Sequence, residues 1–150
     1  MTRLVFTTVL FVSVLLASCS RAMTSVPVVL RLSLASPDHL EEYERFATPN
    51  PSLPFLWLNP DVVISNADVK SATTVRTRDH WGIKIQLTRE ASERFGTFTG
   101  QNVGKTVGIV LNTTMASCDE IKEPIQDGHF IITGAFTRET AEHLALGILQ

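Results

Sequence analysis

Residues 81–100 read WGIKIQLTREASERFGTFTG, and this stretch decides the expected fold. Its first seven residues alternate between apolar and polar side chains, which is the period of a half-buried β-strand. Thr88 follows directly and is a favourable helix N-cap residue. The apolar positions that would share one face of the ensuing helix are Ala91, Phe95 and Phe98. Gly100 is placed to end this helix. A strand that leads through a cap into an amphipathic helix is therefore the central unit of the prediction.

Similar patterns predict the other elements on either side. Strands are expected at residues 28–34, 55–58, 72–78, 107–111, 115–122 and 130–132, and residues 62–64 are another apolar run. Thr137 would cap a last helix, whose apolar positions are Ala141, Leu144, Ala145 and Ile148. Strands that return through short turns, with helices between them, predict an α+β fold in a single domain. We expect a mainly antiparallel sheet with two to three helices packed on it.

The segment after the first strand is predicted to be helical. Ser36 and Pro37 form a good N-cap and first-turn pair. Leu40, Tyr43 and Ala47 then recur at helical spacing, which predicts a helix over residues 37–47. Three prolines between residues 49 and 54 exclude regular structure there.

The N-terminus has the pattern of an export signal. Arg3 precedes an apolar run over residues 4–16, which is too short for a spanning helix. The run ends in Leu16-Ala17-Ser18-Cys19, which resembles a bacterial lipobox. We therefore expect a lipoprotein signal peptide at residues 1–18, a lipidated Cys19, a short tether over residues 19–25 and a domain over residues 26–150. The alternatives are an ordinary secretory signal that is cut near Cys19 and an uncleaved anchor.

The expected tether limits where the domain can work. Six residues, 20–25, reach at most about 20 Å when fully extended, so the domain would stay close to the membrane that holds the lipid. A partner at or near the same membrane is then favoured. Ser20 follows the cysteine in place of an acidic residue. By the sorting convention of bacterial lipoproteins, that residue permits transfer to the outer membrane. The expected location is the extracytoplasmic, periplasmic side of the bacterial cell envelope.

Composition excludes several classes of protein. The formal net charge of the chain is −2, without the basic stripe of a nucleic-acid-binding protein. Only two cysteines are present, and lipidation of Cys19 would leave Cys118 as a free thiol. A lone thiol forms no internal disulfide, so the fold must be held by packing. Asp119 and Glu120 should raise the pKa of Cys118 and keep the thiol unreactive, although a reactive or partner-linking role is the alternative.

The sequence offers no familiar catalytic or cofactor-binding pattern. The four histidines are scattered, without the spacing of a metal site: His39, His80, His129 and His143. No G-x-S-x-G motif is present. The string from Gly100 to Thr106 is one residue short of a phosphate-binding loop, and it follows a helix where such a loop precedes one. We therefore expect no enzyme activity, no metal, no cofactor and no bound nucleotide.

The order of motifs resembles the head part of the first periplasmic domain of SecD/SecDF, accessory subunits of the bacterial protein-export channel. The strand WGIKIQLT leads to the capped helix as in that family. The later matching positions are Asn102-Val103-Gly104-Lys105, Ser117, Glu123-Pro124-Ile125 and Ile132-Thr133-Gly134. The resemblance covers nearly all of the domain, although residues 36–60 match it only by position.

The resemblance implies a role outside the membrane. SecD also contains a membrane bundle that couples proton flow to movement of the head, and these 150 residues hold no further segment apolar enough to span a bilayer. We therefore expect a head-like domain carried by a lipid, which contacts polypeptide or an envelope protein complex without catalysis. A sheet edge or the surface near residues 112–118 is the expected contact. The alternatives are an envelope enzyme with an unrecognised active site and a purely structural lipoprotein.

Overall fold

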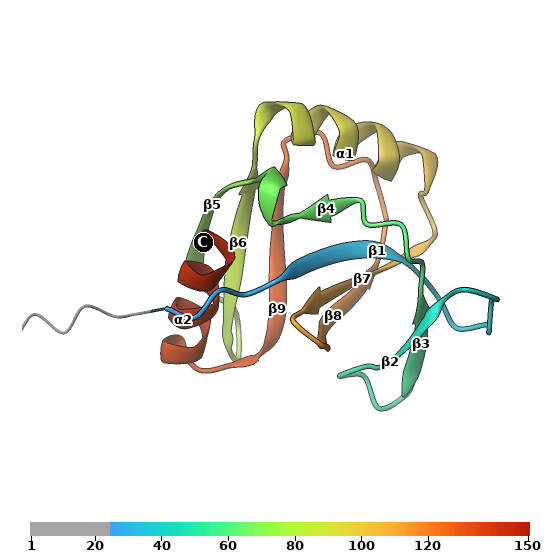
Figure 1. Ribbon diagram of the computed structural model, residues 1–150, viewed down its shortest axis with the longest axis horizontal. Helices are drawn as coiled ribbons and strands as arrows, with labels where there is room; N and C mark the ends of the chain where they lie inside the picture. Colours follow the sequence, from blue (N-terminus) through green and yellow to red (C-terminus); the bar gives the residue numbers. More distant parts are fainter. Residues whose placement is uncertain (1–24) are drawn as a thin grey trace, which may run out of the picture.

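The computed structural model describes residues 25–150, in which nine strands form two antiparallel sheets (Figure 1). The strands are β1 (Leu30–Ser36), β2 (Glu44–Ala47), β3 (Phe55–Leu58), β4 (Ile64–Ser65), β5 (Val69–Arg76), β6 (Trp81–Leu87), β7 (Thr106–Leu111), β8 (Thr114–Glu120) and β9 (His129–Phe136). The helices are α1 (Arg89–Gln101), α2 (Arg138–Ile148) and a single 3-10 turn, η1 (Asn66–Asp68). The α+β class and the mainly antiparallel pairing agree with the prediction.

The larger sheet has the strand order β2-β3-β1-β7-β8, and β4 also pairs with β1. Both faces of its centre are covered. Ile109 and Leu111 of β7 face the main core, whereas Val110 between them faces a smaller cluster. That cluster consists of Phe46, Leu56, Leu58, Val110 and Met115. The unbroken apolar run at residues 109–111 therefore reflects burial on both faces.

The smaller sheet has the order β5-β6-β9 and runs across the direction of β1 (Figure 1). Its inner face carries the alternating apolar residues of β6, of which Ile83 and Ile85 are fully buried. They pack in the main core with Leu30 and Leu32 of β1. The alternation at residues 81–87 thus places one side of β6 in the core, as the pattern predicts.

The two helices begin where the caps predict. Thr88 accepts a hydrogen bond from the backbone N–H of Ala91, and Thr137 accepts one from that of Thr140. Helix α2 lies beside β5 and β6 in Figure 1 and buries Ala141 and Ala145 in the main core. The described residues include no helix that is both long and apolar enough to span a membrane.

Asn66 of η1 joins the first strand to the last helix. Its side-chain oxygen accepts from the N–H of Leu30 at 2.8 Å. Its amide nitrogen donates to the carbonyls of Val28 at 2.7 Å and Ile148 at 2.9 Å. These bonds hold the end of α2 against the start of β1, which fixes that end of α2 relative to the larger sheet.

The predicted helix at residues 37–47 is wrong. Residues 44–47 form β2, which pairs with β3 so that Phe46 lies opposite Leu56. Phe46 is 8% exposed and packs in the smaller cluster, so pairing with β3 buries an aromatic ring that the helical pattern left out. Glu42 has a φ of 73°, a left-handed conformation that a helix through this position excludes.

Two other expectations are corrected. The strands form two sheets and not one, because β5, β6 and β9 pair only with one another. Gly100 does not end its helix, since α1 continues to Gln101 with Asn102 as its C-cap. The tight turn that follows is at Gly104, whose φ is 84°.

Candidate binding groove at a sheet edge

Strand β5 is a long edge strand with an open side. It pairs with β6 and with no other strand. Among residues 25–150, no backbone or side-chain hydrogen bond from another segment reaches its opposite edge. An edge of this kind presents a row of free N–H and C=O groups, which another extended chain can pair with.

A shallow groove of about 300 Å³ runs along this edge, between β5 and α2. Its lining residues are Ala72, Thr73, Thr74, Glu142, Ala145 and Leu146. Three consecutive residues of β5 line the groove. Their side chains alternate between the two faces of the sheet, and only the edge of the strand exposes all three on the same side. The groove therefore follows the edge of β5. Ala72 and Ala145 are nearly buried and form an apolar floor, whereas Leu146 is 43% exposed. The small floor residues leave room for the side chains of a bound segment.

Helix α2 runs antiparallel to β5, so the groove has two distinct ends. At one end, Val69 and Lys70 lie next to Ile148 and Leu149. At the other end, the guanidinium carbons of Arg76 and Arg138 each lie 5.5 Å from the centre of the Trp81 ring. Both ends of the groove therefore carry basic side chains.

Among residues 25–150, the ion pairs near this groove do not include the two basic residues of β5. Glu142 is the acidic residue in the lining, and its carboxylate accepts a hydrogen bond from Nε of Arg138 at 2.7 Å. Within the described part of the chain, Lys70 and Arg76 form no ion pair. Arg76, Arg78 and Lys84 place cations on β5, on the turn after it and on β6, and of these Arg76 lies at the end of the groove.

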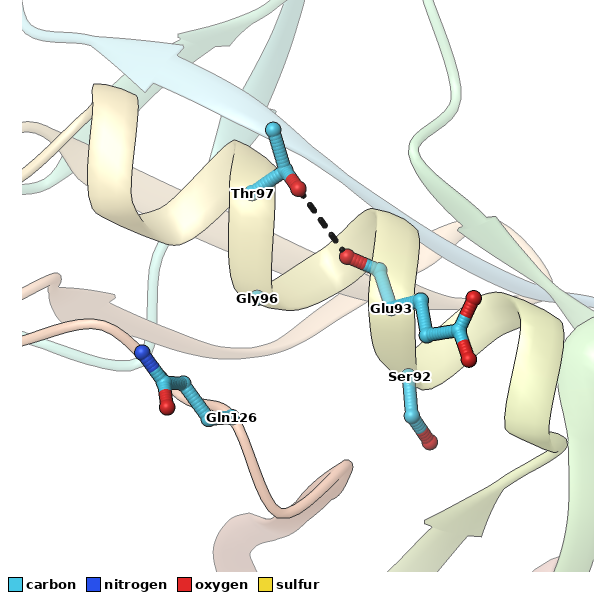
Figure 2. A pocket seen from close by; sticks show the side chains of 5 residues that line it. All are labelled: Ser92, Glu93, Gly96, Thr97 and Gln126. Atoms are coloured by element: carbon cyan, nitrogen blue, oxygen red, sulfur yellow. Dashed lines mark hydrogen bonds between the residues drawn. The ribbon is translucent and has the colours of Figure 1, made fainter.

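A second pocket, of about 370 Å³, lies between α1 and the loop that precedes β9 (Figure 2). The side-chain polar groups of its helical wall are engaged within α1 and its N-cap. The hydroxyl of Ser92 donates to the carbonyl of Thr88 at 2.7 Å, and that of Thr97 donates to the carbonyl of Glu93 at 3.1 Å. The Glu93 carboxylate pairs with Arg89. With its hydroxyls committed to helix carbonyls, this pocket offers no nucleophile that is hydrogen-bonded to a general base.

The sequence-predicted thiol Cys118 lies on β8 and is half-buried. Burial raises its pKa, and the neighbouring Asp119 carboxylate raises it further. The neighbouring acidic residues Asp119 and Glu120 are exposed on the same strand. Cys19 lies outside the described residues. In residues 25–150, no three histidine, cysteine or acidic side chains converge as a metal site would need.

The surface expected near residues 112–118 is a tight hairpin. Asn112 turns the chain with a φ of 58°, and its side-chain oxygen accepts from the N–H of Val29 at 2.9 Å. The sequence did not predict the location of the groove at β5, because hydrophobic periodicity does not reveal which strand lies at a sheet edge. One available signal was the placement of Lys70 and Arg76 at the two ends of a strand with a small, polar centre, which is typical of an edge strand.

Comparison with known proteins decides the family. The model of the SecDF P1 head subdomain matches residues 41–149. The chain belongs to this family. The SecDF head family thus accounts for both sheets except β1, and for both helices. The resemblance that the sequence motifs indicated is therefore confirmed.

Relatives of the head domain are found in larger proteins. The protein translocase subunit SecD of Dictyoglomus turgidum is 42% identical over 64 residues, which are 43% of this chain and 16% of that protein. The SecD subunit of Aquifex aeolicus is 40% identical over 85 residues, which are 56% of this chain and 17% of that protein. The chain therefore spans less than a fifth of the length of these relatives.

Solved structures share the fold. A structure described as that of a membrane component SecDF that enhances protein export matches with a TM-score of 0.66 and 21% identity. The match covers 83% of this chain and 63% of the solved one. A crystal structure of SecDF in a super-membrane-facing form matches with the same score and identity, over 81% of this chain and 18% of the other.

The head-family motif at residues 102–105 forms the turn between α1 and β7. Asn102 accepts hydrogen bonds from Lys105, at 3.0 Å from its backbone N–H and at 2.9 Å from Nζ. The N–H of Gly104 donates to the carbonyl of Ile121 at 2.8 Å. The motif thus joins the helix to the end of β8, and its glycine supplies the left-handed conformation of the turn.

Proposed function

We propose that this protein is a membrane-tethered, extracytoplasmic module of protein export that binds extended polypeptide along the open edge of β5. The observation that carries this proposal is the free edge of β5 beside the apolar groove against α2. The SecD relatives, named protein translocase subunits, support a role in export. The proposed role is binding without catalysis.

Strand addition suits a substrate of varied sequence. The main-chain groups of β5 would supply most of the affinity, and every polypeptide offers the matching N–H and C=O groups. Alternate side chains of the bound segment would lie over Ala72 and Ala145 in the groove. Lys70 and Arg76 at the two ends of the strand oppose pairing between two copies of this chain, because like charges would meet.

Lipidation of Cys19 would hold this groove near a membrane. The N–H of Val28 donates to the carbonyl of Gly147 at 2.9 Å, so the chain enters the domain at the end of α2 that also bears Leu149. Residues 20–25 span at most about 20 Å. A segment that emerges at the same membrane would thus be within reach of β5. We propose the extracytoplasmic side of the envelope as the location.

The binding proposal is tested with a fluorescently labelled, permanently unfolded polypeptide and the folded protein. We expect saturable binding by fluorescence anisotropy, and we expect Leu146→Glu to weaken it, since that change places a second carboxylate beside Glu142 in the groove. Leu40→Glu is the matched control, because Leu40 is 41% exposed and lies outside the groove. Equal affinity of both variants and the unchanged protein would place binding elsewhere and contradict the proposal.

The anchor has its own test. Intact mass measurement of protein extracted from membranes should show a chain that begins at Cys19 and carries acyl chains. Cys19→Ala should release the protein from the membrane fraction. An unacylated N-terminus on the mature protein would refute the anchor while leaving the groove proposal in place.

A further inference from the structure

We propose that the end of the groove at Trp81 selects polypeptide segments that carry an acidic side chain. This inference rests on the proposed function, since it concerns the same groove and names the class of segment that the groove prefers. The feature in question is the cluster of Arg76, Trp81 and Arg138, which we call the arginine end.

Arg76 is the available cation of the arginine end. It is the last residue of β5, and its guanidinium lies over the Trp81 ring, 5.5 Å from the ring centre. Within residues 25–150 no carboxylate pairs with it. A planar guanidinium that rests on an aromatic ring keeps its N–H donors at the rim, where a carboxylate can accept them.

Arg138 retains part of its binding capacity. Its Nε donates to Glu142, and in the described part of the chain no other acceptor is bonded to its terminal nitrogens. The same Trp81 ring lies beneath it. Glu142 thus pairs with Arg138, and Arg76 is the guanidinium at this end that has no ion-pair partner among residues 25–150.

Trp81 reduces the cost of ordering the two arginines. The ring is half-buried and packs against the main core, so it is itself held in place. Both side chains are therefore partly ordered before any ligand arrives, and less conformational entropy is lost on binding. The first turn of α2 lies at this end as well, and the partial positive charge of a helix start favours an anion there.

The expected ligand group is an acidic side chain within a continuing chain. The Arg138 side chain is 70% exposed, so the arginine end is open to solvent and does not close around a chain terminus. An extended segment on the β5 edge can run past Arg76 and present an Asp or Glu to the guanidinium. The preference for an acidic side chain follows from charge complementarity with the Arg76 guanidinium.

The test uses one extended, uncharged peptide with blocked ends and three forms of one position near the arginine end. That position is Asp, Asn or Lys, and the dissociation constant is measured by anisotropy at low and high salt. We expect the Asp peptide to bind about five-fold more tightly than the Asn peptide, the upper range for an exposed charge pair. The Lys peptide should bind more weakly than the Asn peptide. High salt should reduce both differences.

Variants assign the preference to the arginine end. Arg76→Met keeps the apolar stem of the side chain and should abolish most of the preference for Asp over Asn. Arg76→Glu should reverse it in favour of Lys. Arg45→Met is the matched control, because Arg45 also lies over an aromatic ring, that of Phe55, but in the other sheet.

The outcomes separate this inference from the proposed function. If all three peptides bind equally while Leu146→Glu still weakens binding, the acidic preference is overturned and the groove stands. If Arg45→Met removes the preference and Arg76→Met does not, the assignment to the arginine end is wrong. If no peptide binds, both proposals are overturned.

Discussion

The buried hydroxyl of Thr99 accepts a hydrogen bond from the backbone N–H of Ile125 at 2.8 Å, which fastens the loop between β8 and β9 to α1. The same hydroxyl donates to the carbonyl of Phe95 at 2.8 Å. The loop also lies close to Gly96, where a Cβ would make an ordinary contact, 3.5 Å from the carbonyl oxygen of Ile125. One side chain thus connects helix and loop beside the pocket shown in Figure 2.

Replacement of Thr99 by valine tests this connection. Thr99→Val keeps the shape of the side chain but leaves the N–H of Ile125 without its partner. We expect the free energy of unfolding to fall by about 1–3 kcal/mol, as measured in urea. Thr97→Val, on the exposed face of the same helix, is the control and should change it by no more than about 0.5 kcal/mol. Equal effects would mean that the bond to Ile125 contributes nothing specific.

Two helix glycines should respond oppositely to alanine. A Cβ at Gly147 would lie 2.5 Å from the backbone oxygen of Val26, so Gly147→Ala must displace the N-terminal segment and should destabilise the protein. A Cβ at Gly100 would meet only Pro124, at 3.7 Å, which is an ordinary contact. Gly100→Ala should therefore stabilise the protein by about 0.5–1 kcal/mol through helix propensity. Thermal unfolding of both variants measures the difference, and a stabilised Gly147→Ala would contradict the close packing.

Stability should depend on pH through Asp68. Burial alone would raise the pKa of Asp68, but hydrogen bonds from Arg94 and the backbone N–H of Ser65 outweigh it and hold that pKa below its ordinary value. A carboxyl with a lowered pKa in the folded state stabilises the fold above its unfolded pKa of about 4. That contribution is lost as the pH falls through the folded pKa.

The measurement is the free energy of unfolding between about pH 2 and pH 6. Asp68→Asn should be less stable than the unchanged protein at pH 6, and the difference should shrink at the acidic end. Asp79→Asn is the control, since among residues 25–150 the Asp79 carboxylate forms no ion pair. A difference that stays constant with pH would exclude the titration of Asp68 as its cause.

Cys118 should react slowly with alkylating agents near neutral pH. Burial and the Asp119 carboxylate raise its pKa, so little thiolate is present. Asp119→Asn should increase the rate, because it removes the nearby negative charge and lowers the pKa. Glu120→Gln is the matched control and should have a smaller effect. The measurement is the rate at which iodoacetamide modifies Cys118, followed by mass spectrometry. An unchanged rate in Asp119→Asn would contradict the expected effect of the Asp119 carboxylate.

Local sequence patterns correctly predicted the elements whose boundaries depend on residues that are close in the sequence. The alternation in residues 81–87 became β6, and the N-caps Thr88 and Thr137 begin α1 and α2 as expected. These features rely on side-chain period and on a hydroxyl that meets an N–H three residues away. The motif at residues 102–105 is also local, since its turn is closed mainly by Asn102 and Lys105.

Residues 37–47 show where local patterns fail. Leu40, Tyr43 and Ala47 fit a helical face, yet Leu40 and Ala47 are exposed in the structure and Tyr43 is half-buried. Phe46 is the residue that becomes buried, through pairing of β2 with β3. The free energy gained by burying an aromatic ring exceeds that of a weak helical preference. The ring can be buried only when β3 pairs with β2.

The amino-acid sequence alone predicted the α+β class, the capped helices and the likeness to the SecDF head family. Hydrophobic period, helix caps and motif order depend on residues that are close together or ordered along the chain. Three-dimensional packing decided that β5 is an edge strand, that α2 lies antiparallel beside it, and that Arg76 and Arg138 both lie against Trp81. These relationships join residues more than sixty positions apart. Which strand keeps an open edge, and which charged residues lie at its end, follows from the association of distant segments, which no local pattern encodes.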